Sequence, residues 1–198
     1  MNVAIVKYNA GNIFSVNYAL RRLGISAEIT DDHEKIRNAD KVIFPGVGEA
    51  GTTMRYLREY GLDRLICSLN QPVLGICIGL QLMCSYSEEG DTECLGIFDE
   101  KVLKFKQEGG FGRCKIPHMG WNIVTAPDSP LFKGLPSEPY MYYVHSYRAL
   151  TGKHTTGITG YAGNFSASLQ KDNFYAVQFH PEKSGILGAR ILSNFLSL

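Results

Sequence analysis

The cysteine at position 77 has the neighbours that a nucleophile on a sharp turn requires. The segment Gly75-Ile76-Cys77-Ile78-Gly79 lies where an apolar run over 72–76 gives way to a helical pattern from residue 80. A glycine on each side permits the strained strand-to-helix turn that exposes a nucleophile at the edge of a sheet. The amides at the start of the following helix favour the thiolate form. The pentapeptide alone also suits a small core cysteine between two close-packed glycines.

A cysteine nucleophile needs a base, and His180 is the best placed of the five histidines. It directly follows a strand expected over 174–179, and residues at the carboxyl ends of strands in an open α/β sheet lie where ligands bind. Glu182 is two residues further on, close enough in a tight turn to accept from the imidazole and fix its tautomer. His-Pro-Glu alone is typical of a polar turn, but together with Cys77 it predicts a Cys-His-Glu triad.

The elements that must position these residues alternate between strands and helices in the first half of the chain. Apolar runs predict strands over 3–6, 27–29, 41–44 and 72–76, and helical spacing predicts helices over 13–23, 53–60 and 62–69. This rhythm predicts a three-layer α/β fold with a mostly parallel central sheet. After Gly96, runs over 101–106, 140–144 and 174–179 predict an antiparallel extension of the same sheet, and 186–196 a closing helix.

Length and charge exclude several classes of protein. The 198 residues contain 20 Lys and Arg against 19 Asp and Glu, so a nucleic-acid or membrane-surface protein is disfavoured. No linker or repeat divides the sequence, and we expect one domain over 1–198. The first residues lack a signal pattern, and the longest apolar run, 73–84, is too short to span a bilayer, so we expect a cytoplasmic protein. The five cysteines contain no C-x-x-C pair, and Cys114 with His118 supplies only two ligands, so no metal is expected.

A glycine-rich loop offers a competing interpretation. Residues 46–51 read Gly-Val-Gly-Glu-Ala-Gly directly after a strand, which matches the G-x-G-x-x-G pattern of a non-catalytic dinucleotide-binding module. That fingerprint also needs an acidic residue about 20 positions later, at the end of the next strand. Residues 70–72 read Asn-Gln-Pro, so the pattern favours a loop that supplies backbone N–H donors.

The run from Gly75 to Gln81, followed by His180-Pro-Glu182, resembles the class I (triad) glutamine amidotransferases. Within that family, five separated motifs are similar to those of glutaminase subunits that serve a separate cyclase; they lie at 8–12, 45–48, 117–122, 143–148 and 180–184. The chain departs from the usual nucleophile motif at Ile78 and Leu80, where Leu and Met are more common. Both changes are apolar and leave the backbone donor in place. The resemblance implies a flavodoxin-like fold and no cofactor.

The resemblance also implies residue roles. Cys77 attacks the glutamine side-chain amide, His180 is the acid and base, and Glu182 orients it. The oxyanion is held by the backbone N–H groups of Ile78 and Val47. Residues implied to contact glutamine are Gly48, Gln81, Ser146 and Tyr147, and those implied to face a partner subunit are Asn12, Trp121 and Lys183. His118 and His145 lie in the shared motifs and are interpreted as structural.

The implied substrate is L-glutamine and the implied partner is a (β/α)8-barrel cyclase subunit in a heterodimer. Free ammonia is protonated in water and loses its nucleophilicity, so it must reach its acceptor under cover. An amidotransferase of the same type that feeds a different synthase, such as one for surface-sugar amidation, is an open alternative. Its site residues would be the same and only its partner would differ.

Overall fold

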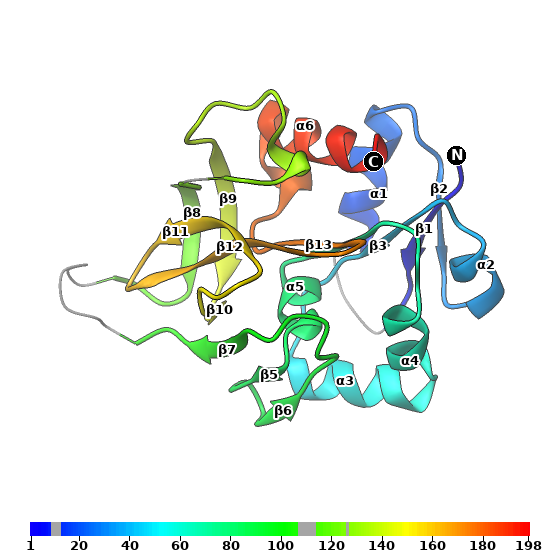
Figure 1. Ribbon diagram of the computed structural model, residues 1–198, viewed down its shortest axis with the longest axis horizontal. Coiled ribbons are helices and arrows are strands. Elements are labelled where there is room, and N and C mark those ends of the chain that lie inside the picture. The colour runs from blue at the N-terminus through cyan, green and yellow to red at the C-terminus, as the bar shows by residue number, and fades with distance from the viewer. Residues whose placement is uncertain (9–12, 107–113, 126) are drawn as a thin grey trace.

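A mixed sheet runs through the middle of the molecule, with helices on both faces (Figure 1). The structure is a computed structural model that describes residues 1–8, 13–106, 114–125 and 127–198. Within these residues the sheet has seven strands in the order β11-β12-β13-β4-β3-β1-β2. The strands are β1 (Val3–Val6), β2 (Ala27–Thr30), β3 (Lys41–Phe44), β4 (Val73–Ile76), β11 (Thr155–Gly160), β12 (Asn164–Lys171) and β13 (Phe174–Val177). The part from β13 to β2 is parallel, and β12 and β11 extend it antiparallel.

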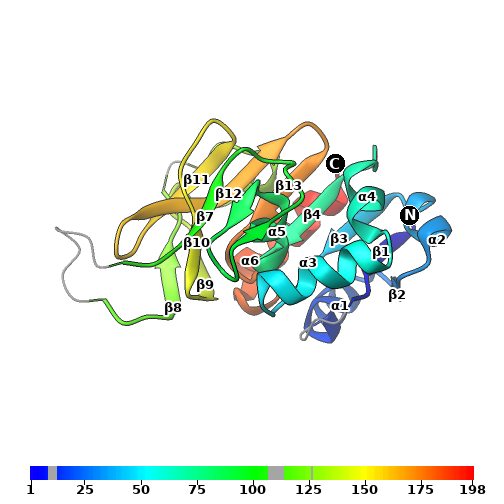
Figure 2. The ribbon, with the colours of Figure 1, turned by 90° about the horizontal axis from the view of Figure 1, so that it is seen from below.

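The two helical layers bury opposite faces of these strands (Figures 1 and 2). One layer contains α1 (Ile13–Arg22) and α6 (Gly185–Leu196), and the other contains α2 (His33–Arg37), α3 (Ala50–Glu59), α4 (Leu62–Cys67) and α5 (Ile78–Met83). Val3 and Ile5 of β1 belong to the first core, while Ala4 and Val6 belong to the second. Successive side chains on a strand point to opposite faces, so a continuous apolar run serves both cores. The three-layer fold is therefore as predicted.

The second half of the chain differs from the prediction in its detail. Strands β7 (Lys101–Lys104) and β9 (Tyr140–His145) are not part of the central sheet and pair in two smaller sheets. Strand β7 joins β5 (Tyr86–Ser87), β6 (Thr92–Glu93) and β10 (Tyr147–Ala149), and β9 pairs with β8 (His118–Ile123). The run at 174–177 pairs parallel to β4 and antiparallel to β12, so the central sheet has the predicted antiparallel extension, but its assignment to these three runs was wrong. The antiparallel strands are β11 and β12; buried Ser166 and Ser168 alternate with buried Phe165, Ala167 and Leu169 on β12, so the strand has no continuous apolar run.

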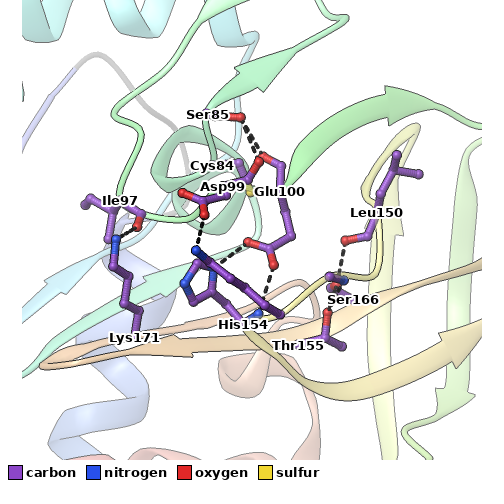
Figure 3. A network of polar contacts seen from close by, with 12 residues as sticks. Cys84, Ser85, Ile97, Asp99, Glu100, Leu150, His154, Thr155, Ser166 and Lys171 are labelled. Carbon is purple, nitrogen blue, oxygen red and sulfur yellow. Dashed lines mark hydrogen bonds and ion pairs between the residues drawn. The ribbon is translucent and has the colours of Figure 1, made fainter.

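A buried polar cluster ties the small four-stranded sheet to the large one (Figure 3). The Glu100 carboxylate accepts from the backbone N–H of His154 and from its ring Nδ1, each at 2.9 Å. Lys171 at the end of β12 donates to the carbonyl of Ile97 at 2.8 Å, and Ser85 donates to that of Glu100 at 3.1 Å. These contacts fix the segment before β7 against the loop before β11. The four-stranded sheet is thus held against the central sheet.

Short connections complete the fold. The 3-10 turn η1 (Pro130–Phe132) packs on α6, and η2 (Pro181–Lys183) leads into α6. Helix α3 starts at Ala50, earlier than predicted, because the Glu49 side chain caps it by accepting from the N–H groups of Gly51 and Thr52. Within the described residues, every helix is too short or too polar to cross a bilayer.

Two glycines allow α5 to pack directly on the central sheet. A Cβ at Gly79 would lie 2.0 Å from the carbonyl oxygen of Phe44 in β3. A Cβ at Gly75 would lie 2.8 Å from the sulfur of Met83 and 3.0 Å from the backbone of Gly79. Helix and strand therefore meet backbone to backbone on either side of residue 77, and a side chain would force them apart.

Replacing Gly79 with alanine should destabilise the protein. The added methyl group overlaps a backbone carbonyl that cannot rotate away, so we expect the free energy of unfolding to fall by about 3 kcal/mol. Gly48→Ala is the matched control, because its Cβ would meet only the Thr53 hydroxyl at 3.4 Å. Urea denaturation followed by circular dichroism measures both. Equal stability of the two variants would contradict the proposed close approach.

Candidate active site

The parallel pairing of β4 with β13 brings Cys77 and His180 to the same edge of the sheet. Phe174 pairs with Val73 and Val177 pairs with Ile76, so the two strands end side by side. The N–H of Cys77 continues this ladder by donating to the carbonyl of Val177 at 2.8 Å. Cys77 and His180, about a hundred positions apart in the sequence, thus follow the carboxyl ends of neighbouring strands, as predicted from the sequence.

Cys77 occupies the strained turn expected of a nucleophile elbow. Its backbone angles are φ 54° and ψ −105°, a conformation that L-residues rarely adopt. The side chain is buried, with 6% of its surface exposed, and the sulfur lies 3.9 Å from the carbonyl oxygen of Val144. Helix α5 begins at the next residue. The strain holds the thiol at the helix N-terminus and out of the sheet.

His180 and Glu182 form a buried pair beside Cys77. The imidazole Nδ1 lies 2.8 Å from a Glu182 carboxylate oxygen, as the two-residue spacing predicts, and 1% and 0% of the two side chains are exposed. The backbone N–H of His180 donates to the carbonyl of Tyr142 at 2.8 Å, which anchors the turn to β9. The second ring nitrogen, Nε2, is buried and has no hydrogen-bond partner among the described residues.

The electrostatics of the pair favour an imidazolium. Burial on its own lowers the pKa of His180, but the negative charge of Cys77 and the carboxylate of Glu182 outweigh it and raise the pKa to about 10. At neutral pH the imidazole is therefore protonated, with Glu182 on one side and Cys77 on the other. An imidazolium next to a thiolate is the charge state in which a cysteine attacks an amide.

A pocket of about 170 Å³ opens next to the sulfur. Seven residues of the sequence-based site line it: Val47, Gly48, Cys77, Ile78, Gln81, Ser146 and Tyr147. Glu89, Val144 and His145 also line it and were not among the predicted site residues. Glu89 is the carboxylate in this lining; burial raises its pKa, while it accepts from the N–H of Ala50 at 2.9 Å. The pocket therefore has a nucleophile at one wall and an anionic group in the same lining.

Gln178 is a further residue at the sulfur that sequence reasoning missed. Its side chain is fully buried, and its Nε2 donates to the Cys77 sulfur at 3.6 Å. Its Oε1 accepts from Gln81 at 3.0 Å, and Gln81 also donates to the carbonyl of Tyr147 at 3.0 Å. The Gln81 contact fixes which end of the Gln178 amide faces the sulfur. The sequence feature that could have indicated Gln178 is its position two residues before His180 on the same extended segment.

Tyr8 braces the glycine-rich loop next to the pocket. Its hydroxyl donates to the carbonyl of Pro45, and a Cβ at Gly46 would lie 1.8 Å from that hydroxyl oxygen. Burial, and next the charge of Cys77, raise the pKa of Tyr8. The first glycine of the G-x-G-x-x-G segment thus packs against Tyr8 and Ile78, and Val47 and Gly48 of the same segment line the pocket.

Two residues expected to face a partner lie together on the surface. Trp121 of β8 is 53% exposed, and its ring contacts that of Tyr142 edge-on with centroids 5.9 Å apart. Lys183 places its ammonium 6.0 Å from the same Tyr142 ring. The third, Asn12, lies outside the described residues. Among the described residues there is no group of three or more His, Cys, Asp or Glu that could hold a metal ion.

Comparison with known proteins agrees with this geometry. Residues 5–198 match the class-I glutamine amidotransferase family. The chain is 58% identical over 201 residues to the imidazole glycerol phosphate synthase subunit HisH of Bacteroides fragilis strain YCH46, with 100% of both covered. It is 47% identical to the HisH subunit of Pasteurella multocida over 196 residues, 98% of this chain and 97% of the relative.

Solved structures agree on the fold. A crystal structure titled glutamine amidotransferase superposes with a TM-score of 0.74 at 20% identity, covering 98% of this chain and 97% of that one. A chain of PurLQS from Thermotoga maritima superposes with a TM-score of 0.72 at 16% identity, covering 99% and 97%.

The chain therefore belongs to the class I glutamine amidotransferases. Within that class it belongs to the HisH family, the glutaminase subunits of imidazole glycerol phosphate synthase in histidine biosynthesis.

The charge state of His180 should depend on Cys77. In the Cys77→Ala variant the pKa of His180 should fall below about 10, because the sulfur's charge no longer offsets the effect of burial. A pH titration of the imidazole ring protons by NMR measures it, with Cys67→Ala, at an exposed cysteine, as the control. An unchanged midpoint in Cys77→Ala would show that the two groups are not coupled.

Proposed function

We propose that this chain hydrolyses L-glutamine to glutamate and ammonia through a thioester on Cys77, and passes the ammonia to a cyclase subunit. The observation that carries the proposal is the strained Cys77, set beside the buried His180–Glu182 pair and opening on a pocket. The central sheet contains strands from both ends of the sequence, which supports a single amidotransferase domain over residues 1–198.

The reaction begins with the thiolate of Cys77 adding to the side-chain amide carbon of glutamine. The oxygen of that amide becomes an oxyanion, for which the backbone N–H groups of Ile78 and Val47 are the proposed donors. Both residues line the pocket next to the sulfur. His180 gives its proton to the amide nitrogen, and the carbon–nitrogen bond breaks to release ammonia and leave a thioester.

Water completes the reaction. Neutral His180 takes a proton from the water molecule as its oxygen adds to the thioester carbon, and the carbon–sulfur bond breaks to give glutamate and the thiolate. Glu182 keeps the proton on Nδ1, so that Nε2 is the nitrogen that exchanges protons with the reacting groups. The imidazolium and the thiolate are both restored for the next cycle.

The pocket lining supports an assignment for each end of glutamine. Gly48, Ser146 and Tyr147 offer backbone and hydroxyl groups, and Gln81 offers an amide. Glu89 is the acid in the lining, so we assign it to the α-ammonium group of the substrate. This adds one residue to the binding set expected from the sequence.

The partner is proposed to be a (β/α)8-barrel cyclase that forms imidazole glycerol phosphate and AICAR in a heterodimer with this chain. Membership of the HisH family supports it over the other synthases that the sequence left open. The surface around Trp121, Tyr142 and Lys183 is the proposed contact, together with Asn12. All five cysteines are thiols, which fits the proposed cytoplasmic location because disulfides are rare there.

Removing the nucleophile should separate the two half-reactions. In the complex with the cyclase, Cys77→Ala should reduce glutamine-dependent synthesis by about 10⁴-fold or more. Synthesis from added ammonium salt should stay within about twofold, since ammonia then bypasses the thioester. Steady-state rates with each nitrogen source measure both, with Cys67→Ala as the control. Glutamine-dependent turnover that survives in Cys77→Ala would disprove the assignment.

Removing the pocket carboxylate should weaken glutamine binding. A hydrogen bond to a charged group contributes about 1.5–3 kcal/mol, so Glu89→Gln should raise the KM for glutamine by roughly 10- to 100-fold with a much smaller change in kcat. Glu88→Gln is the matched control, because that neighbour pairs with Lys106 at 3.7 Å and lies outside the pocket lining. A wild-type KM in Glu89→Gln would rule out this role.

A further inference from the structure

Two buried histidines connect strand β8 to the wall of the pocket. The ring Nδ1 of His118 lies 3.0 Å from Nε2 of His145 across the β8–β9 pair, and Nδ1 of His145 lies 2.7 Å from the carbonyl oxygen of Tyr147. That carbonyl also accepts from Gln81. His118 and His145 are 3% and 6% exposed, and of the two only His145 lines the pocket.

The hydrogen-bond partners fix the direction of every contact. A carbonyl oxygen only accepts, so Nδ1 of His145 must carry a hydrogen. A neutral His145 then accepts at Nε2, and His118 must donate from its own Nδ1. The remaining nitrogen of His118 accepts from the Asn122 amide at 3.3 Å. The orientation of Asn122 is set independently, because its Oδ1 accepts from the N–H of Ile123 and its Nδ2 donates to the carbonyl of Gly160.

The surroundings keep both rings uncharged. Burial lowers the pKa of His118 to about 4. Burial lowers the pKa of His145 to about 3 against the opposing effect of the hydrogen bond to the Tyr147 carbonyl, and electrostatic repulsion from His118 and His180 adds smaller lowering effects. The His118 ring is stacked on the rings of Tyr161 and Tyr143, with centroid-to-centroid distances of 3.9 Å and 4.8 Å. Phe105 contacts both imidazoles, and the Arg148 guanidinium lies 5.6 Å from the centroid of the Phe105 ring.

We propose that His118 is a positioning residue for glutamine hydrolysis, which acts by locking His145 as its Nδ1–H tautomer and so holding the Tyr147 carbonyl and Gln81 in the geometry that binds glutamine. This rests on the proposed function, since Gln81 and Tyr147 are assigned to the substrate pocket. It replaces the purely structural interpretation of the two histidines. The same Gln81 amide orients Gln178 towards the sulfur, so the chain of contacts runs from β8 to Cys77.

The first test uses the unmodified chain. Nitrogen-15 NMR of the histidine side chains should show His118 and His145 neutral and protonated at Nδ1 from pH 8 down to about pH 5, because their pKa values are lowered to about 4 and about 3. An Nε2–H form for either ring, or a charge change near the ordinary pKa of about 6.5, would overturn the proposal. This measurement needs no variant to fold.

The second test separates positioning from packing. His118→Asn keeps an N–H near the position of Nδ1, whereas His118→Leu removes it and leaves Nε2 of His145 without its donor. In the complex with the cyclase, His118→Leu should raise the KM for glutamine by about tenfold, the effect of one lost buried hydrogen bond, while kcat changes little. His118→Asn should restore most of the KM. Phe105→Leu, which removes ring contacts to the two imidazoles and to Arg148 but none of the hydrogen bonds of His118 and His145, should lower stability without this change in KM.

The outcomes distinguish this proposal from the function on which it rests. If His118→Leu and His118→Asn both keep the wild-type KM, the positioning role is wrong while glutamine hydrolysis by Cys77 stands. If Cys77→Ala retains glutaminase activity, the proposed function itself fails. If Phe105→Leu raises KM as much as His118→Leu does, packing alone accounts for the effect and the tautomer lock is rejected.

Discussion

The parallel pairing of β4 with β13 is the interaction on which the active site depends. It sets Cys77 and the segment from Gln178 to His180 at adjacent strand ends, and the N–H of Cys77 extends the same ladder to Val177. A slip of one residue would turn every side chain of β13 to the opposite face of the sheet and would move the imidazole away from the sulfur. Ala176 and Val177 are fully buried in opposite cores, and their packing there resists that slip. The core of the fold therefore sets the register of the proposed triad.

The strain at Cys77 depends in turn on the glycines around it. A positive φ at a non-glycine residue is maintained only when the surrounding structure leaves no relaxed alternative. Gly79 lets α5 press its backbone against the carbonyl of Phe44, and Gly75 leaves room for Met83. The helix is thereby fixed against β3 and β4 on both sides of the turn. The stability of the helix–sheet contact therefore holds the thiol at the start of α5, next to His180 and the pocket.

The parts of the site that the sequence predicts are those with local signals. Cys77 lies between two glycines after an apolar strand, and Glu182 lies two residues from His180. Neither pattern is sufficient alone, but the two together indicate the triad. Glu89 lies in the polar segment Ser87–Gly90, whose sequence is typical of a solvated turn, and only the structure places it in the pocket lining. Strand β12 escaped prediction because Ser166 and Ser168 are buried on it by hydroxyl pairs with Thr155 and Thr156. Contacts of this kind join distant segments, and no periodicity in one segment reveals them.

Strand β9 places the proposed partner surface and the proposed glutamine pocket only a short distance apart. Tyr142 contacts Trp121 and Lys183, while Val144 and His145 line the pocket. Tyr142 and Val144 are two residues apart on β9, which corresponds to about 7 Å along a strand. The site of the proposed ammonia release and the proposed contact with the cyclase are therefore close together. The backbone carbonyl of Tyr142 also accepts a hydrogen bond from the backbone N–H of His180, and the backbone N–H of Tyr142 donates to the Ser184 hydroxyl at 3.0 Å. A shift of β9 caused by the partner would therefore be transmitted to the base of the triad through a backbone hydrogen bond, without any long pathway between the two sites.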